Sequence, residues 1–182
     1  MPRLQPPSLE QMTPEQRTVH DDIVSGPRGQ LQGPLAVWLT SPELADKAQR
    51  LGRFCRFETS LPPRLSELAI LVTGRFWGAE FEWWAHKRIG LEAGLEPELV
   101  EAVRQRRVPE FAGDDQRIVY DVAVQLHRDH RISDRTYAEA VELLGETGVV
   151  ELVGILGYYT LISMTLNAFQ VPLPAGAEPE LD

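Results

Sequence analysis

Apolar residues recur every three or four positions along most of the chain, which is the spacing of a helix that buries one face. One segment shows this period most clearly, through Leu44, Ala48, Leu51, Phe54 and Cys55. The segment 113–130 repeats it, with Ile118, Val122 and Leu126 on one side. No segment convincingly alternates apolar and polar residues, as a half-buried strand does. The pattern predicts an all-α protein with about seven or eight helices.

Capping and turn residues set the boundaries of these helices. Thr13 precedes a proline and stands three residues before Gln16, which is the pattern of a capping box. Ser41 and Ser133 are the expected caps of two later helices, and Gly78 interrupts the chain between two others. The expected helices cover about 13–25, 42–59, 63–76, 80–92, a short stretch within 93–107, 113–130, 133–145 and 149–169.

A single helical domain is expected over residues 13–170, which a chain of 182 residues accommodates well. Residues 1–12 are rich in proline and are expected to form an extended N-terminal arm, and 171–182 a C-terminal tail. The stretch GPRGQLQGP at 26–34 is predicted to be a loop because glycine and proline punctuate it. The segment 149–169 is apolar, which predicts a buried helix or a helix at a subunit interface.

Composition and charge narrow the class of protein. Hydrophobic residues make up 43% and charged residues 25% of the chain, as in ordinary globular proteins. The net charge of -9 argues against nucleic acid as a partner, because phosphates require clustered Lys and Arg. No apolar run of roughly 18 residues or signal-peptide core is evident, so we expect no membrane partner and a cytoplasmic location. The single cysteine, Cys55, fits a reducing compartment.

Candidate chemistry is concentrated between Glu67 and His86. Glu82 and His86 are four residues apart and therefore share one helix face. A carboxylate beside an imidazole orients the ring and raises its basicity, which prepares an acid–base group. Glu67 lies in the apolar preceding helix, and a turn at Gly78 would fold the next helix back, so that Glu67 could approach His86.

A structural interpretation competes with this one. Glu/His pairs at this spacing are common on helix surfaces, where they contribute a few tenths of a kcal/mol. Trp83 is more often a core residue than a substrate platform, Tyr158 more often anchors a helix, and Arg64 is more often ion-paired. No HxxxH or HxxE cluster supplies three convergent ligands, so neither a metal nor a cofactor is expected.

The segment RLSELAILVTGRFWGAEFEWWAHKRIGLEAGLEPELVEAV resembles the carboxymuconolactone decarboxylase family, which shares its fold with alkylhydroperoxidase D-like proteins. The resemblance implies a small carboxylated lactone as substrate and Glu67, Glu82 and His86 as catalytic residues. We expect His86 to supply a proton, Glu82 to tune it and Glu67 to complete the relay. The expected substrate-binding residues are Arg64, Arg75, Trp83 and Tyr158. The resemblance also implies a homo-oligomer, a trimer or a hexamer.

The peroxidase branch of this fold has a CxxC pair between its Glu and His. Aligning Glu67 and His86 onto that motif places the cysteine positions at Ala79 and Glu82, so both thiols are missing. Disulfide cycling requires an attacking and a resolving thiol. We therefore expect a decarboxylase-like lyase. The alternatives are a ligand-binding or assembly protein of the same fold and, ranked lower, a peroxidase that uses Cys55.

Overall fold

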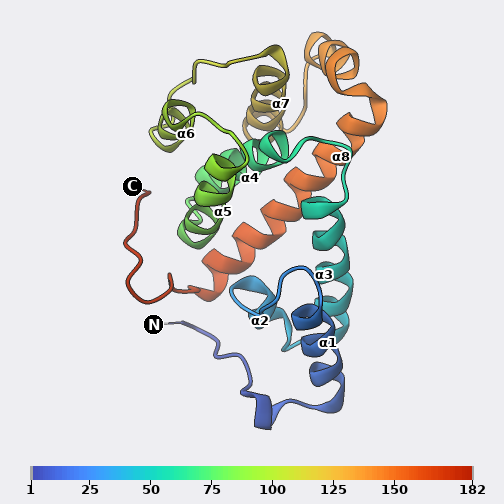
Figure 1. Cartoon of the computed structure of the whole chain (residues 1–182), viewed down its shortest axis with the longest axis vertical. Coiled ribbons are helices and arrows are strands. Elements are labelled where there is room, and N and C mark those ends of the chain that lie inside the picture. The colour runs from blue at the N-terminus through green and yellow to red at the C-terminus, as the bar shows by residue number, and fades with distance from the viewer. Residues whose placement is uncertain (1, 182) are drawn as a thin grey trace.

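A computed structural model of the protein describes residues 2–181 and confirms an all-helical fold (Figure 1). These residues contain eight α-helices, one short 3-10 helix and no strand. The elements are η1 (Leu9–Gln11), α1 (Pro14–Ser25), α2 (Pro34–Trp38), α3 (Pro42–Phe57), α4 (Pro63–Trp77), α5 (Glu80–Glu92), α6 (Pro97–Arg104), α7 (Asp114–Asp129) and α8 (Asp134–Phe169).

One helix was not expected from the sequence: the five-residue α2, which follows the expected loop directly. The last two expected helices share the label α8 and are separated, as predicted, at Gly145, where φ is 72° and ψ is 164°. This left-handed φ is one that glycine adopts without steric cost, so the chain bends there and the two halves remain distinct helices.

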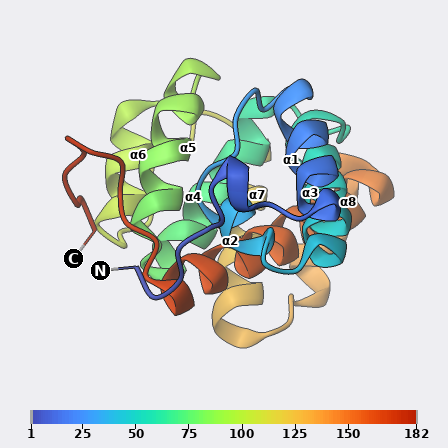
Figure 2. The same ribbon diagram turned by 90° about the horizontal axis from the view of Figure 1, so that it is seen from below.

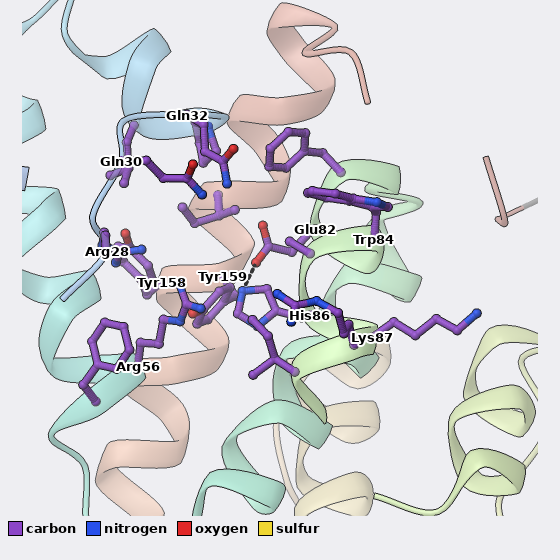
Figure 3. A pocket seen from close by; sticks show the side chains of 18 of the residues that line it. Arg28, Gln30, Gln32, Arg56, Glu82, Trp84, His86, Lys87, Tyr158 and Tyr159 are labelled. Carbon is purple, nitrogen blue, oxygen red and sulfur yellow. Dashed lines mark ion pairs between the residues drawn. The ribbon is translucent and has the colours of Figure 1, made fainter. Parts of the chain in front are cut away.

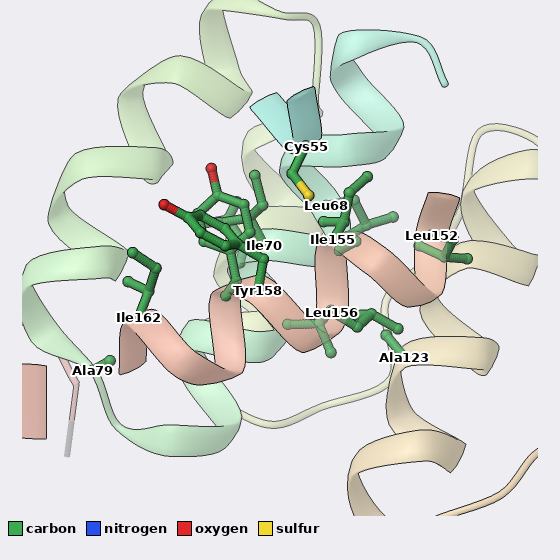
Figure 4. Close-up of a cluster of buried hydrophobic side chains, with 14 of the residues drawn as sticks. Cys55, Leu68, Ile70, Ala79, Ala123, Leu152, Ile155, Leu156, Tyr158 and Ile162 are labelled. Atoms are coloured by element: carbon green, nitrogen blue, oxygen red, sulfur yellow. The ribbon is translucent and has the colours of Figure 1, made fainter. Parts of the chain in front are cut away.

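Helix α4 lies at the centre of the molecule. It packs against α5, α7 and α8, and every residue from Leu65 to Arg75 is buried. A helix that is surrounded on all sides is expected to be mostly apolar, which explains the aliphatic run at 68–72, whereas the buried polar residues Glu67 and Arg75 bind groups on α5 and α6. Figure 4 shows part of the core between α4 and α8, where Leu68 and Ile70 lie near Ile155 and Leu156. Burial of each such side chain contributes about 1.5–3 kcal/mol.

Helix α8 has the length and composition of a membrane span, which corrects the expectation that no segment does. It has 36 residues, and its most apolar 18-residue window has a mean hydropathy of 1.6. However, 56% of that window is buried inside the protein, against α2, α3, α4, α5 and α7. Core helices of this kind pass the same length and hydropathy test, so the test alone is weak evidence for a membrane.

The two terminal segments are held by hydrogen bonds. In the expected arm, the Arg3 amide donates to the Phe169 carbonyl at 2.9 Å, and residues 9–11 form η1. In the expected tail, the amides of Glu180 and Leu181 donate to the Glu80 carboxylate at 3.0 and 2.7 Å. Figure 2 shows the tail running beside α5 and α6. Residues 1 and 182 of these two predicted segments lie outside the described residues.

Candidate functional site

The α4–α5 turn brings the predicted catalytic residues together. Gly78 caps α4 in the left-handed region at φ 58°, and the chain reverses immediately into α5. A Cβ atom on Gly90 would lie 3.3 Å from Leu71 and 3.6 Å from the Glu67 Cβ, so the missing side chain allows α5 to lie close to α4. As a result, Glu67 on α4 contacts His86 on α5.

His86 is bound at both ring nitrogens. Its Nδ1 lies 2.6 Å from Glu67 Oε2, and its Nε2 lies 3.0 Å from Glu82 Oε1. All three side chains are buried, with 6% or less of each exposed. Burial alone would lower the pKa of His86, but the two carboxylates outweigh burial and raise the pKa to about 9. The ring is therefore an imidazolium at neutral pH and donates a hydrogen bond to each carboxylate.

This row of three groups ends at a cavity of about 740 Å³ (Figure 3). Glu82 and His86 line the cavity, whereas Glu67 does not. The order from the protein interior outwards is therefore Glu67, His86, Glu82. A row of alternating acid and base groups can carry a proton between the interior and a molecule in the cavity.

Aromatic side chains of α8 pack beside this row. The ring of Tyr159 lies edge-on to His86, with a centroid distance of 5.1 Å. Tyr158 and Tyr159 both line the cavity and are both almost fully buried. Burial raises the pKa of each phenol, and the carboxylate of Glu82 adds to the effect. Both hydroxyls are therefore neutral and able to donate hydrogen bonds.

The opposite wall of the cavity comes from the loop before α2 and from α3. The loop contributes Arg28, Gln30 and Gln32, and α3 contributes Arg56 (Figure 3). The sequence analysis missed these four residues. For the three loop residues the one signal was an arginine and two amides placed among glycines, because glycine allows a backbone shape that can point side chains inwards. Arg56 on α3 gave no such signal.

Three of the four predicted substrate-binding residues lie away from the cavity. The Arg64 guanidinium pairs with the Asp115 carboxylate of α7. The Arg75 Nε donates to the Arg104 carbonyl at 2.5 Å, and Arg75 borders a separate hollow. Trp83 is fully buried, and its Nε1 donates to Glu180 at 3.3 Å. The neighbouring Trp84 lines the cavity in its place, and Tyr158 is the one predicted binding residue that does so.

The cysteine chemistry of the peroxidase motif has no equivalent here. The two motif positions hold the buried Ala79 and the cavity carboxylate of Glu82. Cys55, the single thiol of the chain, has no exposed surface and packs in the core (Figure 4). Burial raises the pKa of its thiol to about 11, so the thiolate that attacks peroxides is scarce at neutral pH. In residues 2–181, no group of three or more His, Cys, Asp or Glu side chains is placed to hold a metal ion.

Neither a protein-family model nor a curated protein sequence matches the chain significantly. Solved structures do match it over nearly its full length. An uncharacterized peroxidase-related protein from Silicibacter sp. TM1040 has a TM-score of 0.77 at 15% sequence identity, covering 96% of this chain and 92% of that one. The alkylhydroperoxidase AhpD core of a peroxidase-related protein from Ralstonia eutropha JMP134 has a TM-score of 0.79 at 13% identity, covering 96% and 93%.

A third similar structure is that of the debrominase Bmp8, solved in complex with 2,3,4-tribromopyrrole, with a TM-score of 0.70 at 15% identity and coverage of 96% and 91%. These similarities define the class of fold: the chain has the AhpD-like helical fold. Because this fold carries peroxidase-related proteins and a debrominase, it does not by itself assign an activity. The particular chemistry of this chain must come from its own site, in which two carboxylates and an imidazolium adjoin the cavity.

Proposed function

We propose that the protein is an acid–base catalyst of the carboxy-lyase type, acting on a small carboxylated lactone or a related acid. The observation that carries this proposal is the row Glu67–His86–Glu82, which leads from the interior to the cavity. Four basic side chains line the same cavity, namely Arg28, Arg56, Lys87 and Arg88. Lys87 pairs with Glu180 and Arg88 with Glu92, so the charges of Arg28 and Arg56 are the ones that favour an anionic ligand.

Decarboxylation breaks the bond between a carbon and its carboxylate. The carboxylate leaves as CO2, and its electron pair stays on carbon, delocalised into the lactone carbonyl as an enolate. One proton must then reach that carbon, and water restores the proton to the enzyme. The proton comes from the row of three groups beside the cavity.

The geometry changes the roles expected from the sequence. Both nitrogens of His86 are occupied by carboxylates, so no N–H of the ring points freely at the cavity. We assign the direct proton transfer to Glu82, the outermost group of the row. His86 passes its Nε2 proton to Glu82, and Glu67 holds the ring through Nδ1. This arrangement keeps the His86 imidazolium, which supplies the proton to Glu82, charged and oriented before the substrate arrives.

Turnover of carboxylated butenolides in D2O tests the proposal, with CO2 release and deuterium incorporation as the two measurements. We expect one deuterium in the product and at least about a hundredfold lower kcat for Glu82→Gln. Glu98→Gln, on the exposed surface of α6, is the matched control and should retain full activity. A Glu82→Gln variant as active as wild type would remove Glu82 from the mechanism.

The same assay separates the two alternative functions. Tight binding of butenolides by a wild-type protein that releases no CO2 would favour a ligand-binding role for this fold. Peroxide consumption that is lost in Cys55→Ser would favour the thiol peroxidase. We expect no such loss, because the Cys55 thiol is buried and protonated.

A further inference from the structure

We propose that Arg28, Arg56 and Tyr158 form a carboxylate-binding corner of the cavity, here called the arginine corner. It holds an acid group of the substrate that keeps its charge while the reacting atoms lie towards Glu82. This inference rests on the proposed function for the direction of the reaction. The binding step itself does not depend on turnover.

The first argument is a set of buried polar atoms without partners. The Nε and Nη2 atoms of Arg28 and the Oη atom of Tyr158 are inaccessible to solvent and have no hydrogen-bond partner among the described residues. A buried donor left unsatisfied costs about 1–3 kcal/mol, and more when it is charged. A carboxylate in the cavity has two oxygens and can accept these N–H and O–H groups once the two side chains, which line the cavity, turn towards it.

The second argument is the absence of competing anions. Within residues 2–181, neither Arg28 nor Arg56 forms an ion pair, and the Arg56 guanidinium lies over the Phe57 ring at 4.9 Å. Other cations nearby are neutralised: Arg53 pairs with Glu58 and Lys87 with Glu180. Two guanidinium charges therefore remain at one corner of a cavity without a protein carboxylate to balance them.

The net charge of the whole site also favours binding of an anion. With His86 protonated, the row Glu67–His86–Glu82 carries one net negative charge. Arg28 and Arg56 add two positive charges, which leaves a net positive charge that one carboxylate would neutralise. The Tyr158 phenol stays neutral because burial raises its pKa more than the neighbouring Arg28 lowers it, so the phenol can donate a hydrogen bond to the ligand and adds no charge.

The corner is built in advance by glycines. A Cβ atom on Gly52 of α3 would lie 2.0 Å from Tyr158 Oη and 2.7 Å from Arg28 Nη2, so only glycine leaves room for both groups. The loop that carries Arg28 passes through left-handed positions at Gly29 and Gly33, with φ values of 69° and 60°. The contact with Gly52 holds both side chains beside the cavity before a ligand arrives, which limits the conformational entropy lost on binding.

The corner is better suited to a spectator acid than to the group that leaves. Two guanidinium groups stabilise a carboxylate as an anion, whereas a decarboxylating group must lose its charge to become neutral CO2. Holding the leaving group there would stabilise the ground state more than the transition state. The arginine corner therefore orients the substrate, and the labile bond faces Glu82.

Calorimetric titration with γ-butyrolactone-γ-carboxylate, a saturated probe, tests the corner without requiring turnover. We expect wild type to bind the probe and to bind its methyl ester at least tenfold more weakly. Arg28→Gln should weaken binding of the carboxylate at least tenfold and leave the weak binding of the ester unchanged. Arg28→Lys should recover part of the loss, because it restores charge without the forked geometry.

The matched control is Arg53→Gln, an arginine of α3 that pairs with Glu58 and does not line the cavity. It should bind the probe as wild type does. Circular dichroism and Tm of each variant establish that it is folded, and Tyr158→Phe provides a second test that leaves the charges intact. Equal affinity of wild type and Arg28→Gln for the carboxylate would overturn the inference, as would equal affinity of wild type for probe and ester.

These measurements test the arginine corner and the proposed lyase activity independently. If the carboxylate preference is present but no butenolide is turned over, the arginine corner stands and the proposed lyase activity falls. If butenolides are turned over and Arg28→Gln leaves both KM and probe binding unchanged, the lyase stands and the corner falls. An increase of KM in Arg28→Gln larger than any decrease of kcat would support both.

Discussion

At the scale of single residues, the two carboxylates that bind His86 make the stability of the fold depend on the charge of its ring. Its pKa is about 9 in the folded protein against an ordinary value of 6.5. A group whose pKa is raised on folding stabilises the folded state fully below the unfolded pKa. That contribution disappears as the pH rises through the folded pKa. The stabilisation by His86 should therefore be present at pH 6 and lost between about pH 6.5 and 9.

We expect urea unfolding to show this loss directly. The free energy of unfolding of wild type should fall from pH 6 to pH 9.5, by an upper bound of about 3 kcal/mol at roughly 1.4 kcal/mol per pKa unit. Glu67→Gln removes one of the two carboxylates that raise the pKa, so its pH profile should be flatter. Glu98→Gln should run parallel to wild type. Identical slopes in Glu67→Gln and wild type would contradict the assigned ion pair.

Gly52→Ala tests the close contact behind the arginine corner. The added methyl group would overlap the Tyr158 hydroxyl and the Arg28 guanidinium, so we expect a loss of about 1–3 kcal/mol of stability. Gly157→Ala on α8 is the control, because nothing lies within 4 Å of its Cβ position and it lies outside the cavity. That variant should gain up to about 1 kcal/mol through helix propensity. Thermal unfolding of both variants measures the contrast, and an unchanged Tm in Gly52→Ala would show that the corner is looser than described.

The spacing of residues along the chain was enough to predict that the two carboxylates and the imidazole meet, but not that arginines form the opposite wall of the cavity. Glu82 and His86 share a face by helical periodicity, and the turn at Gly78 made their meeting with Glu67 foreseeable. Arg28 comes from a loop whose path depends on how α3 and α8 pack, which no local pattern encodes. For the same reason Arg64 could not be assigned: its partner Asp115 is 51 residues away in the chain.

At the scale of elements, helix ends show where sequence signals suffice. Both Ser41 and Ser133 were predicted as N-caps, and both do precede a helix. Only Ser133 caps through its side chain, with Oγ accepting from the Thr136 amide at 3.1 Å. Ser41 makes no such bond. A capping residue type therefore predicted the boundary correctly in both cases, but the bond itself depends on the backbone geometry of the cap.

This difference predicts unequal effects of two identical substitutions. Ser133→Ala should lower stability by about 1 kcal/mol, the usual value of a side-chain cap. Ser41→Ala should change it by less than about half of that, because no bond is lost. Chemical denaturation of both variants makes the comparison, with each serving as the control for the other. Equal losses would mean that Ser41 also caps α3 in solution.

The C-terminal tail makes contacts with α5 and α6 whose contribution to stability can be measured. Glu180 accepts from Trp83, pairs with Lys87 and lines the cavity, and its carbonyl accepts from Arg104 at 2.9 Å. Ending the chain at Ala175 removes these contacts. We expect the helical circular dichroism signal to remain, with a loss of about 1–2 kcal/mol because the bonds are partly exposed.

Glu178→Gln is the matched control for this truncation, since Glu178 is exposed. It should unfold at the wild-type temperature. Hydrogen exchange of α5 provides the site-specific measurement, and its amides should exchange faster in the shortened chain. If neither Tm nor exchange changes after truncation, the docked tail contributes nothing to the cavity wall in solution.

At the scale of the whole molecule, helical periodicity determined the number and type of elements far better than their arrangement. The chain has the fold of proteins with which it shares 13–15% of residues, so many sequences meet the same packing requirement. In this chain the central helix α4, buried from Leu65 to Arg75, supplies much of that packing.

The surface of the described residues includes a largely apolar groove between α3 and α8, here called the α3/α8 groove. It is lined by Leu51, Phe54, Glu146, Thr147, Val150, Glu151 and Gly154, with the buried Cys55 at its base. Leu51 is 49% and Val150 71% exposed. Clustered apolar side chains of this kind usually mark a contact with another chain. The expectation of a homo-oligomer, drawn from the sequence, therefore has a specific surface on which it can be tested.

We expect light scattering after gel filtration to give a mass above that of one 20.5 kDa chain for wild type, and a lower mass for Val150→Glu. A charge placed in a buried contact between chains would be desolvated without a partner, which opposes assembly. Val108→Glu is the matched control, because Val108 is 77% exposed and lies outside the groove. It should leave the mass unchanged. If wild type elutes as a monomer, or if both variants shift the mass equally, the α3/α8 groove is not the site of assembly.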